Sequence, residues 1–218
     1  MRRWRVVWLV LALTALITFG AGGGVGSASV RQADDMDRDI SAAVYVVNRY
    51  WSTHWSRFFT GRYSRPGVFG GYQRGVRKPP FCGAVRLTYD NAWYCSDDDY
   101  IAWDVDLMRE GYRFGDAWVY LVIAHEWGHA VQRRLDASLV LRTYELQADC
   151  LAGAALYGAA ADGLLRFEKG DVEEMAAAHR RLGDATPWTD VGDHGTAAQR
   201  MSAFKRGARY GVSGCLPR

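Results

Sequence analysis

The segment that most constrains this chain is His125-Glu126-Trp127-Gly128-His129. In a helix, residues four positions apart lie on one face, so the imidazoles of His125 and His129 can reach a single cation. Glu126 then lies beside the cation without being one of its ligands. This H-E-x-x-H pattern predicts a helix that binds zinc, with Glu126 as the general base of a hydrolytic reaction.

The third metal ligand is expected on the following helix. A catalytic zinc ion takes three protein ligands and keeps one position open. Glu145 follows His129 by sixteen residues, and Asp149 stands four positions after Glu145. We therefore predict that Glu145 binds the metal. We also predict that Asp149 accepts a hydrogen bond from one of the zinc-binding histidines, which fixes the orientation of that imidazole.

Other candidates for the third ligand are less favourable. The longer pattern H-E-x-x-H-x-x-G-x-x-H fails, because Leu135 stands where its third histidine would be. His179 lies in a charged helical segment and is expected to face solvent. His54 lies in an aromatic segment near the N-terminus. Glu145 therefore remains the predicted ligand.

His194 is the candidate donor to the oxyanion of the reaction. Zinc lowers the pKa of its bound water towards about 7, and Glu126 accepts the proton as that water attacks a peptide carbonyl. His194 lies between Asp193 and Gly195 in a loop that leads into a helix, where it can donate to the developing negative charge. A purely structural role for His194 is an equally open interpretation.

The length and the charge of the chain limit its class. With 218 residues the chain is long enough for one catalytic domain, which we place at residues 31–218. The net charge of +3 is small, and the arginines are scattered, whereas nucleic-acid binding requires a clustered basic surface. We expect a peptide or protein substrate and no nucleic-acid partner. The sequence does not indicate an oligomeric state.

The N-terminus has the pattern of a signal peptide or a membrane anchor at residues 1–30. Arg2, Arg3 and Arg5 precede an uncharged apolar run at residues 6–19, and a segment rich in glycine, alanine and serine follows. The run is shorter than the about 20 residues of a membrane span, although the small residues after it can lengthen it. Both interpretations predict an extracytoplasmic protein, either secreted or anchored to the cell membrane by this one segment.

The four cysteines agree with an oxidising compartment, where an even number is typical of disulfide bonds. Three pairings are possible. Cys82 and Cys95 flank a short segment, and Cys150 and Cys215 are the remaining two. The sequence therefore favours the pairs Cys82–Cys95 and Cys150–Cys215.

The hydrophobic pattern predicts a mainly helical fold. Helices are expected at residues 34–59, 117–135, 138–160 and 196–209, and a further helix is expected to begin at Asp171. Asp116 and Ser138 are expected to cap the second and third of these helices. Asp171 and Glu174 have the spacing of a capping box.

Extended segments are expected between the first two helices. Residues 61–80 are rich in glycine, arginine and proline and should form a loop, and segments 84–89 and 100–105 should pair. Three consecutive aspartates at residues 97–99 predict an exposed acidic turn, because no EF-hand spacing surrounds them. The predicted fold class is mainly α (α+β): one zincin-like domain with a small β element before the active-site helix.

Three stretches resemble the bacterial family of putative neutral zinc metallopeptidases: HEWGHAVQ at residues 125–132, ELQADCLAG at 145–153 and HGTAAQR at 194–200. The resemblance covers roughly residues 34–215 and implies a zinc ligand at Glu145 in an exported or membrane-anchored peptidase. The chain departs from the family pattern at Ala130, where a histidine is frequent, and at Asp193, where threonine or serine is common. Neither difference removes a metal ligand or the base.

We therefore expect an exported or membrane-anchored zinc metallopeptidase that hydrolyses peptide bonds. Two alternatives are a catalytically silent zinc-binding or scaffold protein of the same fold and a membrane-tethered interaction domain led by the aromatic N-terminal helix. The presence of Glu126 favours the enzyme, because an inactive relative would usually lack the general base.

Overall fold

The computed structural model describes residues 24–186 and 193–217. Residues 1–23 of the expected signal or anchor lie outside this description, as do residues 187–192 of the loop before His194. Within the described residues, no helix combines the length and the apolar character that crossing a membrane requires.

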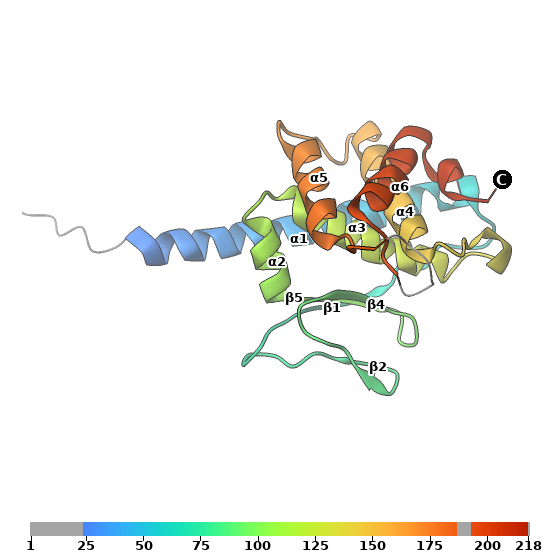
Figure 1. Cartoon of the computed structure of the whole chain (residues 1–218). Helices are drawn as coiled ribbons and strands as arrows, with labels where there is room; N and C mark the ends of the chain where they lie inside the picture. The colour runs from blue at the N-terminus through green and yellow to red at the C-terminus, as the bar shows by residue number, and fades with distance from the viewer. Residues whose placement is uncertain (1–23, 187–192, 218) are drawn as a thin grey trace, which may run out of the picture.

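Helices make up most of the described chain, which has a small sheet on one side (Figure 1). The helices are α1 (Gly24–Phe58), α2 (Val105–Tyr112), α3 (Ala117–Gln132), α4 (Tyr144–Ala161), α5 (Asp171–Leu182) and α6 (Ala197–Tyr210), with short 3-10 turns η1 (Ala137–Leu139) and η2 (Val212–Cys215). Helix α4 packs against both α3 and α6, and α1 packs against α3 and α4. The prediction of a mainly helical fold with a small sheet is confirmed, although α1 begins earlier than expected.

Helix α3 lies in the centre of the core. Only Tyr120 of its 16 residues is not buried. A helix that is apolar all round needs contacts on every side, and here α1, α2, α4, α5 and strand β4 (Ala92–Cys95) provide them. Gly128 permits the close approach to α4, because a Cβ atom there would lie 2.7 Å from the carbonyl oxygen of Ala148.

The three-stranded sheet has the order β1-β5-β4, in which β1 is Gly67–Tyr72 and β5 is Tyr100–Asp104. Strand β5 is parallel to β1 and antiparallel to β4. The predicted loop at residues 61–80 is therefore wrong where β1 forms. Glycines have little intrinsic strand preference, and this strand depends on the ladder that β5 offers. A glycine is also required at Gly71, where a Cβ atom would come within 2.6 Å of Val105.

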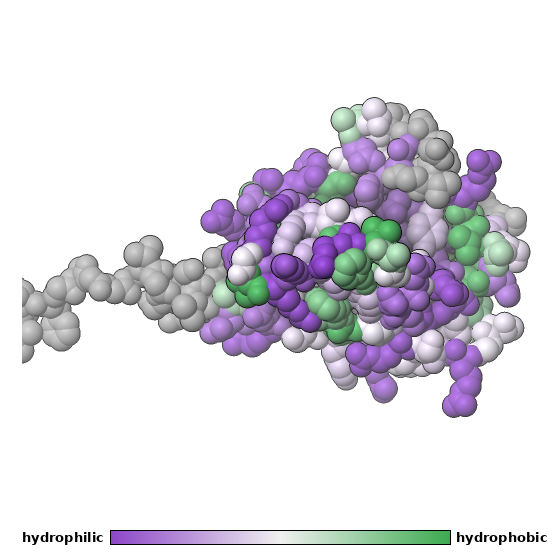
Figure 2. Space-filling view, turned by 90° about the horizontal axis from the view of Figure 1, so that it is seen from below, coloured by the Kyte–Doolittle hydropathy of each residue, from purple (hydrophilic) through white to green (hydrophobic). Residues whose placement is uncertain are grey.

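The expected pairing of residues 84–89 with residues 100–105 is also wrong. Strand β5 already pairs with β1 on one edge and with β4 on the other. Strand β3 (Val85–Arg86) instead pairs with β2 (Phe81–Cys82) in a separate hairpin. Apolar side chains near this hairpin are exposed, among them Val76, Phe81 and Val85, and Figure 2 shows apolar spots among polar side chains on the face seen from below.

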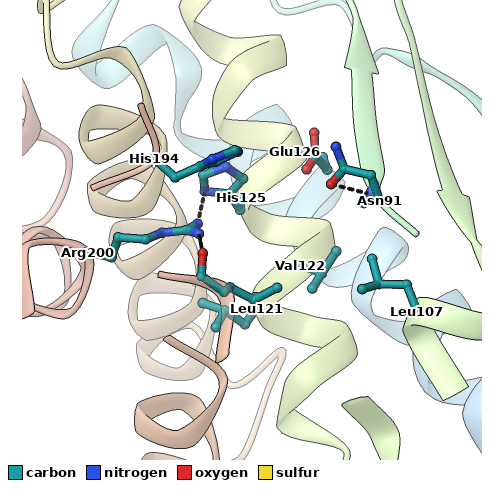
Figure 3. Close-up of a pocket in the computed structure, with 10 residues that line it drawn as sticks. Asn91, Leu107, Leu121, Val122, His125, Glu126, His194 and Arg200 are labelled. Carbon is teal, nitrogen blue, oxygen red and sulfur yellow. Dashed lines mark hydrogen bonds between the residues drawn. The ribbon is translucent and has the colours of Figure 1, made fainter. Parts of the chain in front are cut away.

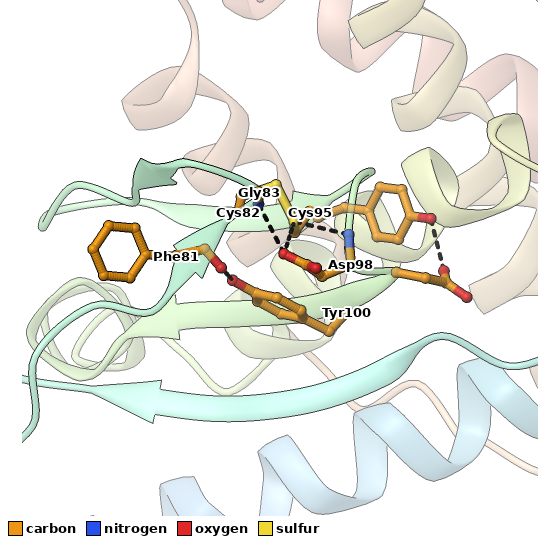
Figure 4. Close-up of a disulfide and its surroundings, with 8 residues drawn as sticks. Phe81, Cys82, Gly83, Cys95, Asp98 and Tyr100 are labelled. Atoms are coloured by element: carbon orange, nitrogen blue, oxygen red, sulfur yellow. Dashed lines mark hydrogen bonds between the residues drawn. A yellow bond between two sulfur atoms is a disulfide. The ribbon is translucent and has the colours of Figure 1, made fainter.

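Both disulfides have the pairing that the sequence favours, Cys82–Cys95 and Cys150–Cys215. The first disulfide fastens the β2–β3 hairpin to β4 (Figure 4). The acidic turn at residues 97–99 takes part in this linkage, because Asp98 accepts a hydrogen bond from the backbone N–H of Gly83 at 2.8 Å. The segment is thus an ordered turn that braces the hairpin.

Helix α4 begins later than the sequence predicts. Ser138 lies in η1, and the first residue of α4 is Tyr144. The intervening chain folds back on Gln147, whose side-chain amide donates to the carbonyl of Leu139 and accepts from the N–H of Leu141. These contacts hold the segment outside the helix, which no local pattern could have shown.

The starts of α3 and α5 are linked. Asp116 is the N-cap residue of α3, as predicted, but its side chain makes no capping hydrogen bond. The N–H of Ala117 donates instead to Glu174 of α5 at 3.4 Å. The N-cap of α5 is Gly170. The predicted capping box of Asp171 and Glu174 is therefore wrong, because the Glu174 carboxylate is turned towards α3.

Candidate active site

Helix α3 places two imidazoles against each other. His125 and His129 are 7% and 8% exposed, and their Nε2 atoms lie 3.1 Å apart. Their rings are nearly perpendicular, with an angle of 87° between the planes. The spacing of four residues thus brings both Nε2 atoms to one point, as the sequence predicts.

Glu145, in the first turn of α4, lies at the same point. Its Oε2 lies 3.1 Å from His125 Nε2, and its Oε1 lies 3.4 Å from His129 Nε2. Tetrahedral zinc bonds of about 2.0–2.1 Å hold neighbouring ligand atoms about 3.3 Å apart. The two nitrogen donors and the carboxylate therefore fit a zinc ion in both chemistry and spacing.

Asp149 supports His125 on the side away from Glu145. Its side chain is fully buried, and its Oδ1 lies 2.7 Å from His125 Nδ1. Burial alone would raise the pKa of Asp149, but Arg200 and His125 hold this pKa well below its usual range. Arg200 of α6 donates to both carboxylate oxygens, at 2.9 and 3.0 Å. The role of Arg200 could not be predicted from the sequence, because only the packing of α6 on α4 brings it here.

His125, His129 and Glu145, which we call the ligand set, form a site that favours a positive charge. Burial alone would lower the pKa of His125, but Asp149 and Glu145 outweigh it and raise this pKa to about 10. Histidine must lose its proton before it can bind a metal. A zinc ion at this point would therefore replace the proton on His125 that Asp149 and Glu145 stabilise.

Apart from Glu145, the side chains that contact the His129 ring outside the pair of histidines are neutral. Its Nδ1 lies 2.9 Å from Gln132 Oε1, and its ring stacks on Tyr144 with 4.8 Å between centroids. Gln132 stands three residues after His129 and so shares its side of the helix. The role of Gln132 was therefore predictable from this spacing, although the prediction above does not include it.

Glu126 lies in the wall of the cleft beside the ligand set. Its side chain is buried, and the backbone N–H of Tyr94 in β4 has a small lowering effect on the pKa of its carboxylate. Burial raises the pKa of Glu126, against the opposing effect of His125 and His129. A carboxylate with a raised pKa accepts a proton more readily than an ordinary glutamate, as a general base in hydrolysis requires.

The cleft extends to both sides of Glu126. A cavity of about 250 Å³ exposes the ligand set and is lined by β4 and Tyr144. A second cavity of about 110 Å³ shares Asn91, Ala92, His125, Glu126 and His194 with the first and is otherwise mainly apolar, lined by Leu107, Leu121, Val122 and Leu182. Figure 3 shows this apolar end below His125 and Glu126. The cleft thus joins a polar end at the two histidines and Glu145 to a mainly apolar end.

His194 lies at the rim of the cleft. Its side chain is 46% exposed, and its Nε2 lies 3.9 Å from Glu145 Oε2. The backbone N–H groups of His194 and Gly195 donate to Asp184 Oδ2 at 2.8 and 3.1 Å. The structure therefore places His194 beside the ligand set, and Asp184, which no sequence pattern singled out, holds its backbone there.

Two further histidines lie outside the ligand set. The prediction that His179 faces solvent is wrong, because its side chain is buried against Phe204 and its Nδ1 donates to the carbonyl of Met175 at 2.7 Å. The two arginines that follow His179, Arg180 and Arg181, are exposed instead. His54 binds Asp162 at 2.6 Å and links α1 to the end of α4.

Comparison with known proteins agrees with the motifs. The sequence model of the family described as putative neutral zinc metallopeptidase matches residues 136–215, a region that starts just after the H-E-x-x-H helix. The chain is 32% identical over 162 residues to the uncharacterized protein YpfJ of Escherichia coli strain K12, covering 63% of this chain and 52% of that protein. The protein of the same name in strain O6:H1 gives the same values.

The chain spans about half the length of the curated relatives that it matches. No solved structure matches it. The matched region contains Glu145, Asp149, His194 and Arg200. The resemblance to the family of putative neutral zinc metallopeptidases seen in the motifs is thus confirmed over residues 136–215.

Proposed function

We propose that this protein is a zinc-dependent peptidase that acts outside the cytoplasm. One observation carries the proposal: the Nε2 atoms of His125 and His129 converge with the carboxylate of Glu145 beside Glu126, in a cleft open to substrate. The family match supports the metal and the reaction class.

Each of these side chains has a separate role in the proposed hydrolysis of a peptide bond. Zinc in such a site supplies Lewis acidity, which polarises a carbonyl and makes water nucleophilic near neutral pH. Glu126 takes the proton from the attacking water and returns it to the leaving amine, and its raised pKa suits both transfers. His194 donates to the negative charge that develops on the carbonyl oxygen.

The geometry of the cleft suits an extended peptide. Strand β4 forms an edge of the sheet and lines the larger cavity with Ala92, Trp93 and Tyr94. A peptide can add to such an edge through main-chain hydrogen bonds. The adjoining apolar cavity would take an apolar side chain next to the cleaved bond, which favours substrates that carry one there.

The location is part of the proposal. The two disulfides support an oxidising compartment. The basic and apolar residues at the N-terminus have the composition of a signal or an anchor, which would secrete the domain or tether it to the membrane.

The test compares wild type with Glu126→Gln, which keeps the shape of the side chain and removes the base. We expect both proteins to bind the same amount of zinc. Only wild type should hydrolyse denatured casein in a chelator-sensitive reaction, with the variant slower by about 10²–10⁴-fold. If wild type binds zinc but cleaves neither casein nor a broad peptide library, the protein is the catalytically silent zinc-binding alternative.

A further inference from the structure

Two buried glutamines connect α3 to α4 behind the metal site. Gln132 is the last residue of α3, and Gln147 lies near the start of α4. They are 2% and 0% exposed, and Gln132 Nε2 donates to Gln147 Oε1 at 3.1 Å. A buried amide is costly unless its hydrogen bonds are satisfied, so this pair needs an explanation that the mechanism does not supply.

Backbone groups determine which way the Gln147 amide points. Its Oε1 accepts from the N–H of Leu141 at 3.0 Å. Its Nε2 donates to the carbonyls of Leu139 and Cys215 at 2.8 and 3.0 Å. A backbone N–H can only donate and a carbonyl can only accept, so exchanging the oxygen and nitrogen of this amide would break all three bonds.

Gln147 and the carbonyl of Tyr144 together determine the orientation of Gln132. Gln132 Nε2 donates to the carbonyl of Tyr144 at 2.7 Å as well as to Gln147 Oε1. Gln132 Oε1 therefore faces His129 Nδ1, at 2.9 Å. Because Oε1 can only accept, the hydrogen must be on His129 Nδ1, and Nε2 keeps its lone pair. Nε2 is the atom that lies 3.1 Å from His125 Nε2.

We propose that Gln132 and Gln147 are positioning residues that form an amide relay, which fixes His129 in the tautomer whose Nε2 binds the metal. The proposal rests on the zinc site of the proposed function. The far end of the relay is the carbonyl of Cys215 in η2, and the Cys150–Cys215 disulfide holds that turn against α4. The C-terminal turn thus becomes part of the support of a metal ligand.

The relay differs from the support of His125. Asp149 is ionised and carries its own cation, Arg200. The glutamines are neutral, so they orient His129 without adding charge to a site that already contains Glu145 and Asp149. The relay should therefore act on the tautomer and the ring orientation of His129. Its loss should weaken zinc binding, although all three ligands remain.

The test uses Gln147→Met, which removes every hydrogen bond of the amide, keeps similar length, and alters a residue that does not touch His129. Zinc affinity is measured by competition with a chelator. The His129 tautomer is read from ¹⁵N shifts of labelled histidine in the metal-free protein at about pH 8, with the signal assigned by its loss in His129→Gln. We expect zinc binding about 10–100-fold weaker and a mixture of tautomers.

Leu156→Ala, a buried substitution on the same helix, serves as the matched control for lost stability. It should leave the His129 signals and the zinc affinity as in wild type. The relay is refuted if Gln147→Met matches wild type in both measurements, or if the control shifts them equally. If Gln147→Met fails to fold, the ¹⁵N shifts of wild type still test the relay. The relay requires the hydrogen of metal-free His129 on Nδ1, and a wild-type signal with the hydrogen on Nε2 refutes it. A wild type that binds no zinc would instead refute the proposed function.

Discussion

Arg200 of α6 holds Asp149 of α4 with two hydrogen bonds, and Asp149 in turn holds the imidazole of His125. All three side chains are buried. A charged carboxylate is tolerated in the interior only where a partner charge and hydrogen bonds offset its desolvation. The orientation of His125 therefore depends on a residue that lies 51 positions after Asp149 in the chain.

Replacing Arg200 with methionine should destabilise the protein by about 3–5 kcal/mol, because the Asp149 carboxylate would stay buried without its cation. Urea unfolding of the metal-free protein measures the free energy of unfolding. Arg206→Met, at an exposed position of the same helix, is the control and should change this free energy by about 0.5 kcal/mol or less. An unchanged stability of Arg200→Met would show that Asp149 does not need this partner.

Chelation should abolish hydrolysis and leave the helices folded, because apolar contacts hold α3 on all sides. The pKa of His125 is raised to about 10 in the metal-free site, so zinc must displace a proton at neutral pH. Zinc affinity should therefore rise with pH up to about 10. Calorimetric titration in buffers of different ionisation enthalpy counts the protons released, and circular dichroism follows the helices. Binding without proton release would contradict this account of the site.

Replacing His194 with alanine should lower kcat by about 10²–10³-fold with little change in KM, if the imidazole donates to the oxyanion. Zinc content and thermal stability should stay close to wild type, because the side chain is half exposed at the rim. Steady-state kinetics and thermal unfolding together distinguish the two roles of His194. Normal kcat with a lower melting temperature would assign this residue to loop structure.

Lowering the pH should reduce the stability of the folded protein because the imidazole of His179 is buried. Burial lowers the pKa of His179 from 6.5. Below about pH 6.5, His179 is therefore protonated in the unfolded chain but stays neutral in the folded protein until a lower pH is reached. The contribution of His179 is thus neutral above pH 6.5 and destabilising as the pH falls below it. His179→Leu should lose less stability between pH 7 and pH 5 than wild type. Parallel urea titrations test this, and identical pH profiles would refute it.

The main residues of the candidate site were predictable because they are local in sequence. His125, Glu126 and His129 share one helix, and Glu145 and Asp149 repeat the spacing of four residues on the next. Helical geometry alone then determines which side chains share a face. The structure places all five together, and the hydrogen bond between Asp149 and His125 is the one the sequence predicts.

Features that depend on contacts between distant segments could not be predicted in this way. Strand β1 exists because β5 pairs with it, whereas its glycines indicate a loop. The burial of His179 follows from which face of α5 meets α6, and a charged segment does not reveal that choice. Arg200 and Gln147 acquire their roles only when α4, α6 and η2 are packed.

The enclosure of α3 determines which positions of this protein tolerate substitution. Most substitutions in that helix would damage the core itself. Trp93 and Tyr94 of β4 and the side chain of His194 border the same cleft and are only partly buried, so substitutions there disturb the core less. Under the proposed function, the substrate preference can therefore change while the residues that carry the chemistry stay the same.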